Sequence, residues 1–250
     1  MTSDPGILQP APVTAPSAAP ASREFSRKLQ CVAVLLVAFG LPIASSLLVF
    51  FRHRPMHAAT PGRTMAAVVF QLIGLSCLYL ALHYQKRGWK SIGLRLPMRI
   101  AEVGHSFVLF FSAFPVGFVA AIFIFAVYAA FGQEWRQNFN VSALFGSRIS
   151  IFTVIFVLLN PLHEELIVRG FLITEMEHFY KNTALAIFVS VFIQSSYHLY
   201  QGLAPALLHA STFLLFSLYF VRARRILPVV MAHLFLDVSA LAVYARHIAK

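Results

Sequence analysis

Long apolar runs separated by short polar or basic segments are the feature that most limits how this sequence can fold. Each run is close to the roughly 20 residues that an α-helix needs to cross the hydrocarbon core of a bilayer. The 250-residue chain is 59% hydrophobic and only 12% charged, which lies outside the range of soluble globular domains. Seven such runs can be drawn, at residues 29–51, 65–83, 106–131, 149–171, 184–200, 203–221 and 226–245.

The sequence therefore predicts an all-α fold, a polytopic transmembrane helix bundle of about seven spans. An eighth helical segment, or a helix that crosses only half of the bilayer, is also possible, because Pro161 interrupts one run and only Gln201 and Gly202 separate two others. Broken helices are tolerated at membrane depth where they line a cavity, so we expect the active site inside the bundle.

Residues 1–22 differ from the rest of the chain. They are rich in Pro, Ala, Ser and Thr and almost without large apolar side chains. Such a segment cannot bury enough surface to offset the entropy that ordering costs. We predict a disordered tail over residues 1–22 and a transmembrane domain over residues 23–250.

The basic residues indicate how the chain lies in the membrane. The net charge is +11, but the basic residues occupy short loops between apolar runs instead of one stripe. This pattern argues against a nucleic acid partner and favours contacts with membrane lipids. Counted over the loops, twelve Lys and Arg lie on the side of the amino terminus and seven on the other side. We expect an integral protein of the plasma (inner) membrane with a cytoplasmic amino terminus.

Two carboxylates and a guanidinium interrupt the apolar run 149–171. An ionised group at the bilayer centre costs about 3 kcal/mol, so such residues usually face the protein interior and serve a function. On one helix, Glu165 and Arg169 are four positions apart and can form a structural pair. Glu164 lies about 100° round the helix from Glu165 and has no charged partner in its own segment. It is therefore the better general base of the two glutamates.

Further polar side chains fall within the later runs. His233 and Asp237 share one helix face at positions i and i+4, which favours a common polar cavity. His198 lies near the end of the run 184–200, and His209 lies alone in the next run. For His209 we expect a hydrogen bond to a neighbouring helix.

Two familiar protease motifs are absent from the sequence. The pair His163-Glu164 begins like the zinc-protease motif His-Glu-x-x-His, but position 167 is Ile. No Gly-x-Ser-x-Gly turn is present that could hold a serine nucleophile. Cys31 and Cys77 fall inside apolar runs, where a thiol behaves as a small hydrophobic group, so neither a disulfide framework nor a cysteine-based metal site is implied.

The polar motifs, in their order, resemble those of the CPBP family, which contains type II CAAX prenyl endopeptidases and bacterial Abi or bacteriocin-processing proteins. The family motifs are Glu-Glu-x-x-x-Arg, Phe-x-x-x-His and His-x-x-x-Asn or Asp. The resemblance covers residues 87–245, and Gln194 stands where the family usually has Phe. The matching residues here are Glu164, Glu165, Arg169, Gly170, His198, His233 and Asp237.

This resemblance implies an intramembrane endopeptidase similar to CAAX prenyl protease type 2. Glu164 and His198 would activate a water for attack on a peptide carbonyl, and His233 and Asp237 would stabilise the oxyanion or complete the site. A carboxylate donates a hydrogen bond only when protonated, so Asp237 is better suited to orient His233 or to bind a cation. The implied substrate is a peptide or protein that is prenylated or otherwise membrane-associated.

Two mechanisms stay open within this interpretation. Glu164, His198 and His233 form a set that suits Zn²⁺, and the same residues suit a glutamate mechanism without a cofactor. We favour the metal-free mechanism, because the side chains that hold zinc normally have further hydrogen-bond partners, and the sequence identifies none.

Two other functions also stay open. Glu and His in membrane spans form relays in proton-coupled transporters. A transporter would be expected to have inverted repeats, whereas the charged residues within spans are concentrated in the second half of this chain. A catalytically silent immunity or scaffold protein is the third interpretation.

Overall fold

The structure is a computed structural model, and it describes residues 21–52, 58–132, 141–146 and 148–248. Within these residues every regular element is a helix. Six helical segments are long and apolar enough to cross a membrane: Ser22–Arg52, Pro61–Tyr84, Ile100–Ala130, Ile151–Tyr180, Leu203–Ala223 and Leu227–Ile248. The all-α, polytopic fold is thus confirmed, with a span count close to the seven expected.

The fifth predicted run, residues 184–200, does not form a full crossing. Helix α8 covers only Thr183–Ser196, about 21 Å at 1.5 Å per residue, which is too short for a typical hydrocarbon core. The chain then turns, and a short 3₁₀ helix, η4 (Leu199–Gln201), leads into α9 (Leu203–Ala223). The backbone thus breaks beside His198, inside the bundle.

The first long rod contains a change of helix type next to a proline. It consists of α1 (Ala21–Leu35), the π-helical turn η1 (Leu36–Gly40) and α2 (Leu41–Arg52). Pro42 has no backbone N–H to donate to the preceding turn, and a π-turn accommodates such a missing bond without ending the helix. The predicted tail lies outside the described residues up to position 20, and α1 already begins at Ala21.

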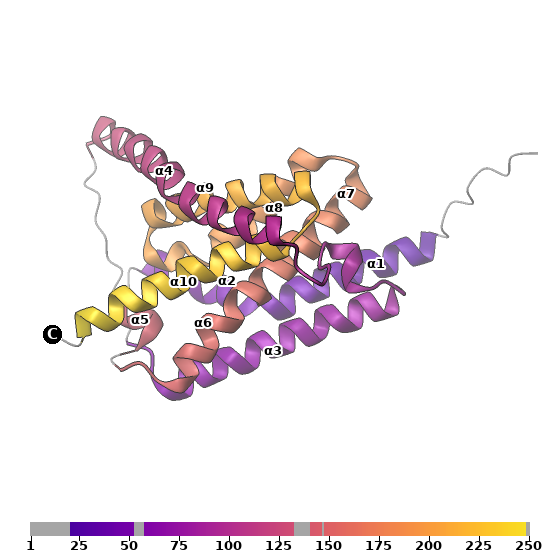
Figure 1. Cartoon of the computed structure of the whole chain (residues 1–250), viewed down its shortest axis with the longest axis horizontal. Helices are drawn as coiled ribbons and strands as arrows, with labels where there is room; N and C mark the ends of the chain where they lie inside the picture. The colour runs from indigo at the N-terminus through magenta and orange to yellow at the C-terminus, as the bar shows by residue number, and fades with distance from the viewer. Residues whose placement is uncertain (1–20, 53–57, 133–140, 147, 249–250) are drawn as a thin grey trace, which may run out of the picture.

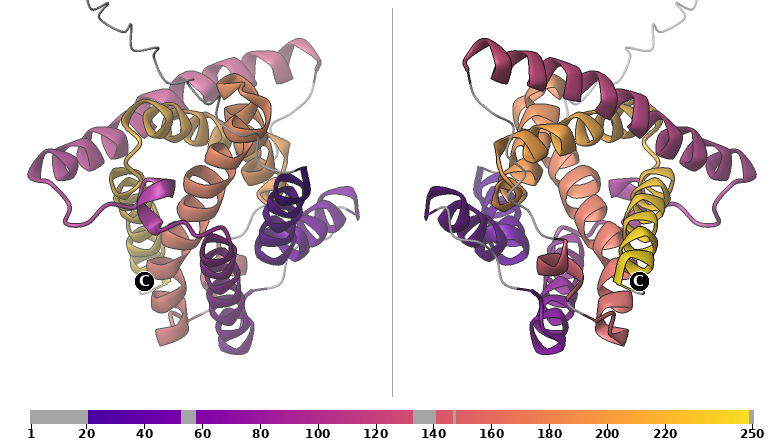
Figure 2. Two further views of the ribbon diagram at one scale, coloured as in Figure 1. Left: turned by 90° about the vertical axis from the view of Figure 1, so that its right-hand side faces the viewer. Right: turned by 90° about the vertical axis from the view of Figure 1, so that its left-hand side faces the viewer.

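The glutamate-bearing rod runs through the middle of the bundle (Figures 1 and 2). It consists of α6 (Ile151–Glu164), the π-helix η3 (Glu165–Ile173) and α7 (Thr174–Tyr180). Helix α6 packs against α3 (Pro61–Tyr84) and α10 (Leu227–Ile248), and η3 packs against α8. All nine residues of η3 are buried, so this segment is the centre of the core.

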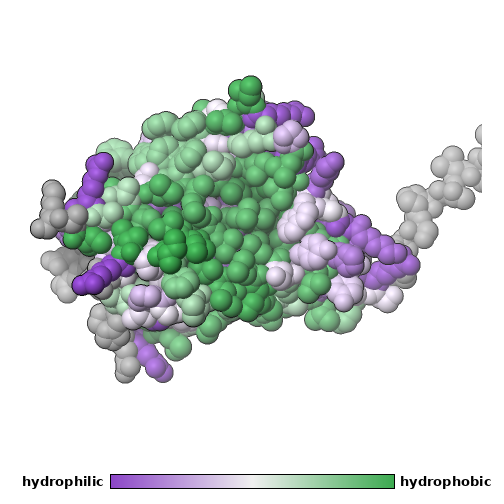
Figure 3. Space-filling model, turned by 60° about the horizontal axis from the view of Figure 1, so that its bottom comes forward, coloured by the Kyte–Doolittle hydropathy of each residue, from purple (hydrophilic) through white to green (hydrophobic). Residues whose placement is uncertain are grey.

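The longest helix, α4 (Ile100–Ala130), lies obliquely across α9 and α10 (Figure 1). Its 31 residues span about 46 Å, so it is long enough to cross the roughly 30 Å hydrocarbon core at a tilt. Its outer face exposes apolar side chains such as Phe111, Phe118 and Phe123. Figure 3 shows an apolar band across the face in view, with hydrophilic side chains gathered toward its two ends. This distribution is the one that a bilayer requires.

Ion pairs tie the elements together where α7 meets α1. Glu175 is fully buried and accepts hydrogen bonds from Arg27, at 2.6 Å, and from Arg87. The carboxylate thus joins α7 to α1 and to the turn that follows α3. Two further pairs, Arg224 with Glu177 and Arg225 with Glu102, connect the α9–α10 turn to α7 and α4.

Gly170 allows a close approach at the middle of η3. A Cβ atom on Gly170 would lie 2.8 Å from the backbone oxygen of Ile92, in the short helix η2 (Trp89–Ile92). Because a side chain cannot occupy that space, the glycine that follows Arg169 serves to seat η2 against η3.

Candidate active site

The two neighbouring glutamates lie where the α-helix changes to a π-helix. Pro161 lacks the N–H that would close the turn before it, and from Glu165 onward the helix adopts the wider i to i+5 pattern. Such π-segments are frequent at functional sites. Glu164 and Glu165 leave this junction in different directions and meet different partners.

Glu165 is buried behind the cavity wall and has two partners, Arg169 and His233. Its carboxylate accepts a hydrogen bond from Arg169 Nη1 at 2.9 Å, as the i and i+4 spacing predicts. Its Oε1 atom also lies 2.7 Å from Nδ1 of His233, a contact that the sequence did not indicate. Arg169 donates further to the backbone oxygen of Phe213 and lies over the rings of Phe213 and Phe216. The pair thus holds η3, α9 and α10 together.

Among the residues that the structure describes, Glu164 has no cationic partner within hydrogen-bond distance. Its Oε2 atom accepts a hydrogen bond from the side-chain nitrogen of Gln194 at 2.8 Å. Gln194 is fully buried on α8, at the position where the resemblance leads one to expect Phe. The departure from the family pattern therefore provides the neutral donor that orients this carboxylate.

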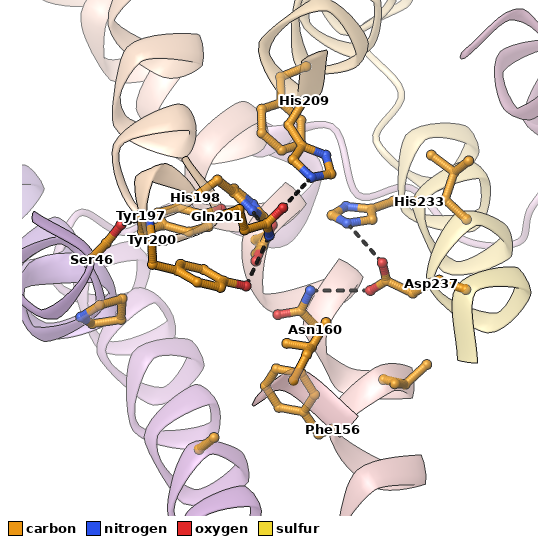
Figure 4. A pocket seen from close by; sticks show the side chains of 18 of the residues that line it. Ser46, Phe156, Asn160, Tyr197, His198, Tyr200, Gln201, His209, His233 and Asp237 are labelled. Carbon is orange, nitrogen blue, oxygen red and sulfur yellow. Dashed lines mark hydrogen bonds and ion pairs between the residues drawn. The ribbon is translucent and has the colours of Figure 1, made fainter. Parts of the chain in front are cut away.

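A chain of polar contacts runs from α3 to α10. Gln71 donates to Oδ1 of Asn160 at 2.9 Å, and Asn160 donates to Oδ2 of Asp237 at 3.2 Å. The other carboxylate oxygen of Asp237 lies 3.6 Å from Nε2 of His233 (Figure 4). Each ring nitrogen of His233 therefore faces a carboxylate, Glu165 on one side and Asp237 on the other.

His198 lies in the break after α8, beside a second imidazole. The ring centroids of His198 and His209 are 4.7 Å apart, and the side-chain amide of Gln201 contacts one nitrogen of each ring (Figure 4). The Gln201 nitrogen is 3.2 Å from His198 Nδ1, and its oxygen is 3.0 Å from His209 Nε2. The remaining nitrogen of His198, Nε2, is buried and has no hydrogen-bond partner among the described residues. The hydrogen bond expected for His209 is thus made to η4, the short helix before its own.

One cavity brings the four predicted catalytic residues together. Glu164, His198, His233 and Asp237 all line a space of about 1330 Å³, whereas Glu165 and Arg169 are not part of its lining. The amides Gln71, Asn160 and Gln201 also line it, with apolar side chains from α2, α3 and α4 around the rest. The result is a large apolar chamber with a polar group of side chains on its wall.

Three of the lining amides, and Gln194 on Glu164, were not assigned to the site from the sequence. Gln71 and Asn160 interrupt apolar runs, and a buried amide in a membrane span needs a hydrogen-bond partner, which was the available signal. Gln201 was treated only as a short gap, and Gln194 only as a departure from the family pattern. Their roles depend on which helices face one another.

The donor set does not fit a zinc ion. Both nitrogens of His233 face carboxylates, and one oxygen of Glu164 is taken by Gln194. Across the part of the chain that the structure describes, no three His, Cys, Asp or Glu side chains are grouped so that they could hold a metal ion. A zinc site needs such a group, with open lone pairs converging on one point.

The comparison with protein families agrees with the motif analysis. Residues 146–239 match the family described as Type II CAAX prenyl endopeptidase Rce1-like. This match is narrower than the resemblance expected over residues 87–245, but it contains Glu164, His198, His233 and Asp237. Neither the curated proteins nor the solved structures gave a match. Over these residues, this integral membrane protein is similar to the Rce1-like type II CAAX prenyl endopeptidases, a family of intramembrane proteases.

Proposed function

We propose that this protein is an intramembrane endopeptidase that hydrolyses a peptide bond with a water activated by Glu164, assisted by His198, His233 and Asp237. The contrast between the two glutamates supports this proposal most directly. Glu165 is neutralised by Arg169 and faces His233, whereas Glu164 lines the cavity and accepts a hydrogen bond from a neutral amide. A carboxylate without a cation is the better proton acceptor.

The reaction follows from these positions. Glu164 removes a proton from a water as its oxygen attacks the peptide carbonyl, and the carbonyl oxygen becomes negatively charged. His198, whose buried Nε2 has no hydrogen-bond partner among the described residues, lines this cavity and can hold the water or the oxyanion, and His233 lines the same cavity beside Asp237. The proton on Glu164 then passes to the leaving amine as the C–N bond breaks. The Asp237 carboxylate lies 3.6 Å from Nε2 of His233 and orients that ring.

The same cavity suggests the class of substrate. Its volume of about 1330 Å³ and the apolar residues around most of it suit a peptide that carries a large hydrophobic group. We propose a prenylated or otherwise membrane-associated peptide or protein, in line with the name of the matching family. Membrane lipids surround the apolar band.

We favour the glutamate mechanism over the metal mechanism. The engagement of both His233 nitrogens with carboxylates supports this choice, since zinc would compete with Glu165 and Asp237 for that ring. No step of the reaction proposed above passes through a metal.

For the plasma membrane and a cytoplasmic amino terminus, the basic residues supply the argument. Arg27, Arg87 and Arg224 belong to ion pairs near α7, and the loop after α3 adds exposed Lys86 and Lys90. Basic residues are enriched on the cytoplasmic side. Labelling of Gln85→Cys and Gly104→Cys in intact cells, with a reagent that does not cross membranes, tests this orientation at two sites.

Purified protein in detergent, supplied with fluorogenic peptides with and without a prenylated cysteine, tests the function. We expect cleavage of the prenylated peptides, no effect of a zinc chelator, and loss of cleavage in Glu164→Gln. Inhibition by the chelator that added zinc reverses would contradict the glutamate mechanism. Absence of cleavage of any peptide would favour the transporter or silent-scaffold alternatives.

A further inference from the structure

Gln201 connects two histidines in a way that affects how His198 can react. The amide is buried, with only 7% of its surface exposed, and it makes three hydrogen-bond contacts. Its nitrogen lies 3.2 Å from Nδ1 of His198 and donates to the hydroxyl of Tyr200 at 3.0 Å. Its oxygen lies 3.0 Å from Nε2 of His209.

The number of contacts determines which way this amide points. A side-chain amide nitrogen carries two hydrogens, and here it has two acceptors, His198 and Tyr200. The reversed amide would leave one N–H without an acceptor in a buried site, whereas an under-used carbonyl oxygen is more easily tolerated. The nitrogen therefore faces His198, and the oxygen faces His209.

This orientation has a consequence for the proton on His198. A neutral imidazole carries one proton, on either Nδ1 or Nε2, and the partner of one nitrogen selects the tautomer. Because Gln201 donates to Nδ1, that nitrogen must be the acceptor, and the proton lies on Nε2. The Nε2 atom belongs to a residue that lines the cavity and has no other partner among the described residues.

We propose that Gln201, held in turn by His209, is a positioning residue that keeps His198 in the Nε2–H tautomer. This inference rests on the proposed function and makes its division of roles sharper. His198 then meets the water or the substrate carbonyl as a hydrogen-bond donor, and Glu164 is the group that accepts the proton. An Nε2–H nitrogen has no lone pair for a metal, which agrees with the glutamate mechanism.

The tautomer can be read from the nitrogen chemical shifts of the full-length protein labelled with ¹⁵N-histidine in detergent. The signals of His198 are assigned by their loss in His198→Gln. We expect the wild-type protein to carry the His198 proton on Nε2. In Gln201→Glu the carboxylate only accepts, so the proton should move to Nδ1. The matched control, Gln85→Glu at the polar end of α3, should leave the His198 signals unchanged.

The same variants separate a positioning role from a packing role. Gln201→Glu should lower kcat for peptide cleavage by about 10- to 100-fold, the usual effect of losing a supporting partner, with KM nearly unchanged. If Gln201→Glu does not fold, Gln201→Met removes the donor without adding charge, and His198 should then populate both tautomers.

Two results would overturn the inference: a proton on Nδ1 in the wild-type protein, or an unchanged tautomer in the folded Gln201 variants. These signals do not depend on turnover. A protein with the expected tautomers but no peptidase activity would therefore contradict the proposed function and leave the role of Gln201 intact. An active protein with the opposite tautomer would contradict only the role of Gln201.

Discussion

Nδ1 of His233 lies 2.7 Å from Oε1 of Glu165, although 68 positions separate the two residues in the chain. Glu165 therefore serves two partners, Arg169 on its own helix and His233 on α10. The contact orients the His233 ring so that its other nitrogen faces Asp237. The buried ion pair and the cavity are thus parts of one connected arrangement, and changes to the pair should reach the site through His233.

The first prediction concerns Glu164→Gln, which keeps the shape of the side chain but cannot accept the proton from water. We expect peptide cleavage to fall by roughly 10²–10⁴-fold, the usual effect of losing a general base. Thermal unfolding in detergent should show that the variant is folded. The control is Glu24→Gln, which removes an exposed carboxylate paired with Lys28 and should cleave normally. Near wild-type turnover in Glu164→Gln would show that another group is the base.

The second prediction concerns the buried pair of Glu165 and Arg169. Glu165→Leu leaves the Arg169 charge uncompensated and should cost about 3–5 kcal/mol of the free energy of unfolding. Arg169→Met should cost less, because Glu165 keeps its contact with His233. The double variant should be milder than the sum of the two. Strictly additive losses in denaturation experiments would mean that the two side chains do not interact.

The third prediction concerns Asn160, which donates to Asp237 at 3.2 Å. Asn160→Asp places two carboxylates in contact and removes the donor, so we expect a loss of about 1–3 kcal/mol in stability. The double variant Asn160→Asp with Asp237→Asn exchanges donor and acceptor and should regain most of that loss.

Thermal unfolding of the three variants measures this effect. Asn182→Asp is the matched control, because Asn182 caps the start of α8 and Asp caps a helix equally well. Equal stability of Asn160→Asp and Asn182→Asp would contradict the contact between Asn160 and Asp237.

The fourth prediction concerns Gly74 on α3. A Cβ atom there would lie 2.6 Å from Nε2 of His163, the residue before Glu164, and 3.3 Å from Cβ of Ala38. Gly74→Ala should therefore displace the His163 ring, lower stability by about 1–3 kcal/mol and reduce cleavage. Gly104→Ala on α4 has open space around its Cβ and should stabilise its helix by about 0.5–1 kcal/mol. Equal free energies of unfolding of the two variants would show that α3 can move away from His163.

Sequence reasoning was successful where one helix contains the whole relationship. The pairing of Glu165 with Arg169 and the common face of His233 and Asp237 follow from the i and i+4 geometry of a helix. The apolar runs likewise predicted the all-α membrane fold, because the hydrocarbon core sets the length that a spanning helix needs. These features are local or depend on composition, so the sequence alone determined them.

Only the tertiary structure decided which polar groups meet across helices. The contact of Glu165 with His233, of Gln194 with Glu164 and of Gln71 with Asn160 each joins two different helices. Such contacts depend on the rotation and depth of each helix, which are set by packing against its neighbours. The end of α8 at Ser196, inside the predicted run 184–200, is decided in the same way. A break there is tolerated because other parts of the protein take up backbone hydrogen bonds that lipid cannot provide, as the Ser46 hydroxyl does for the backbone N–H of Tyr200.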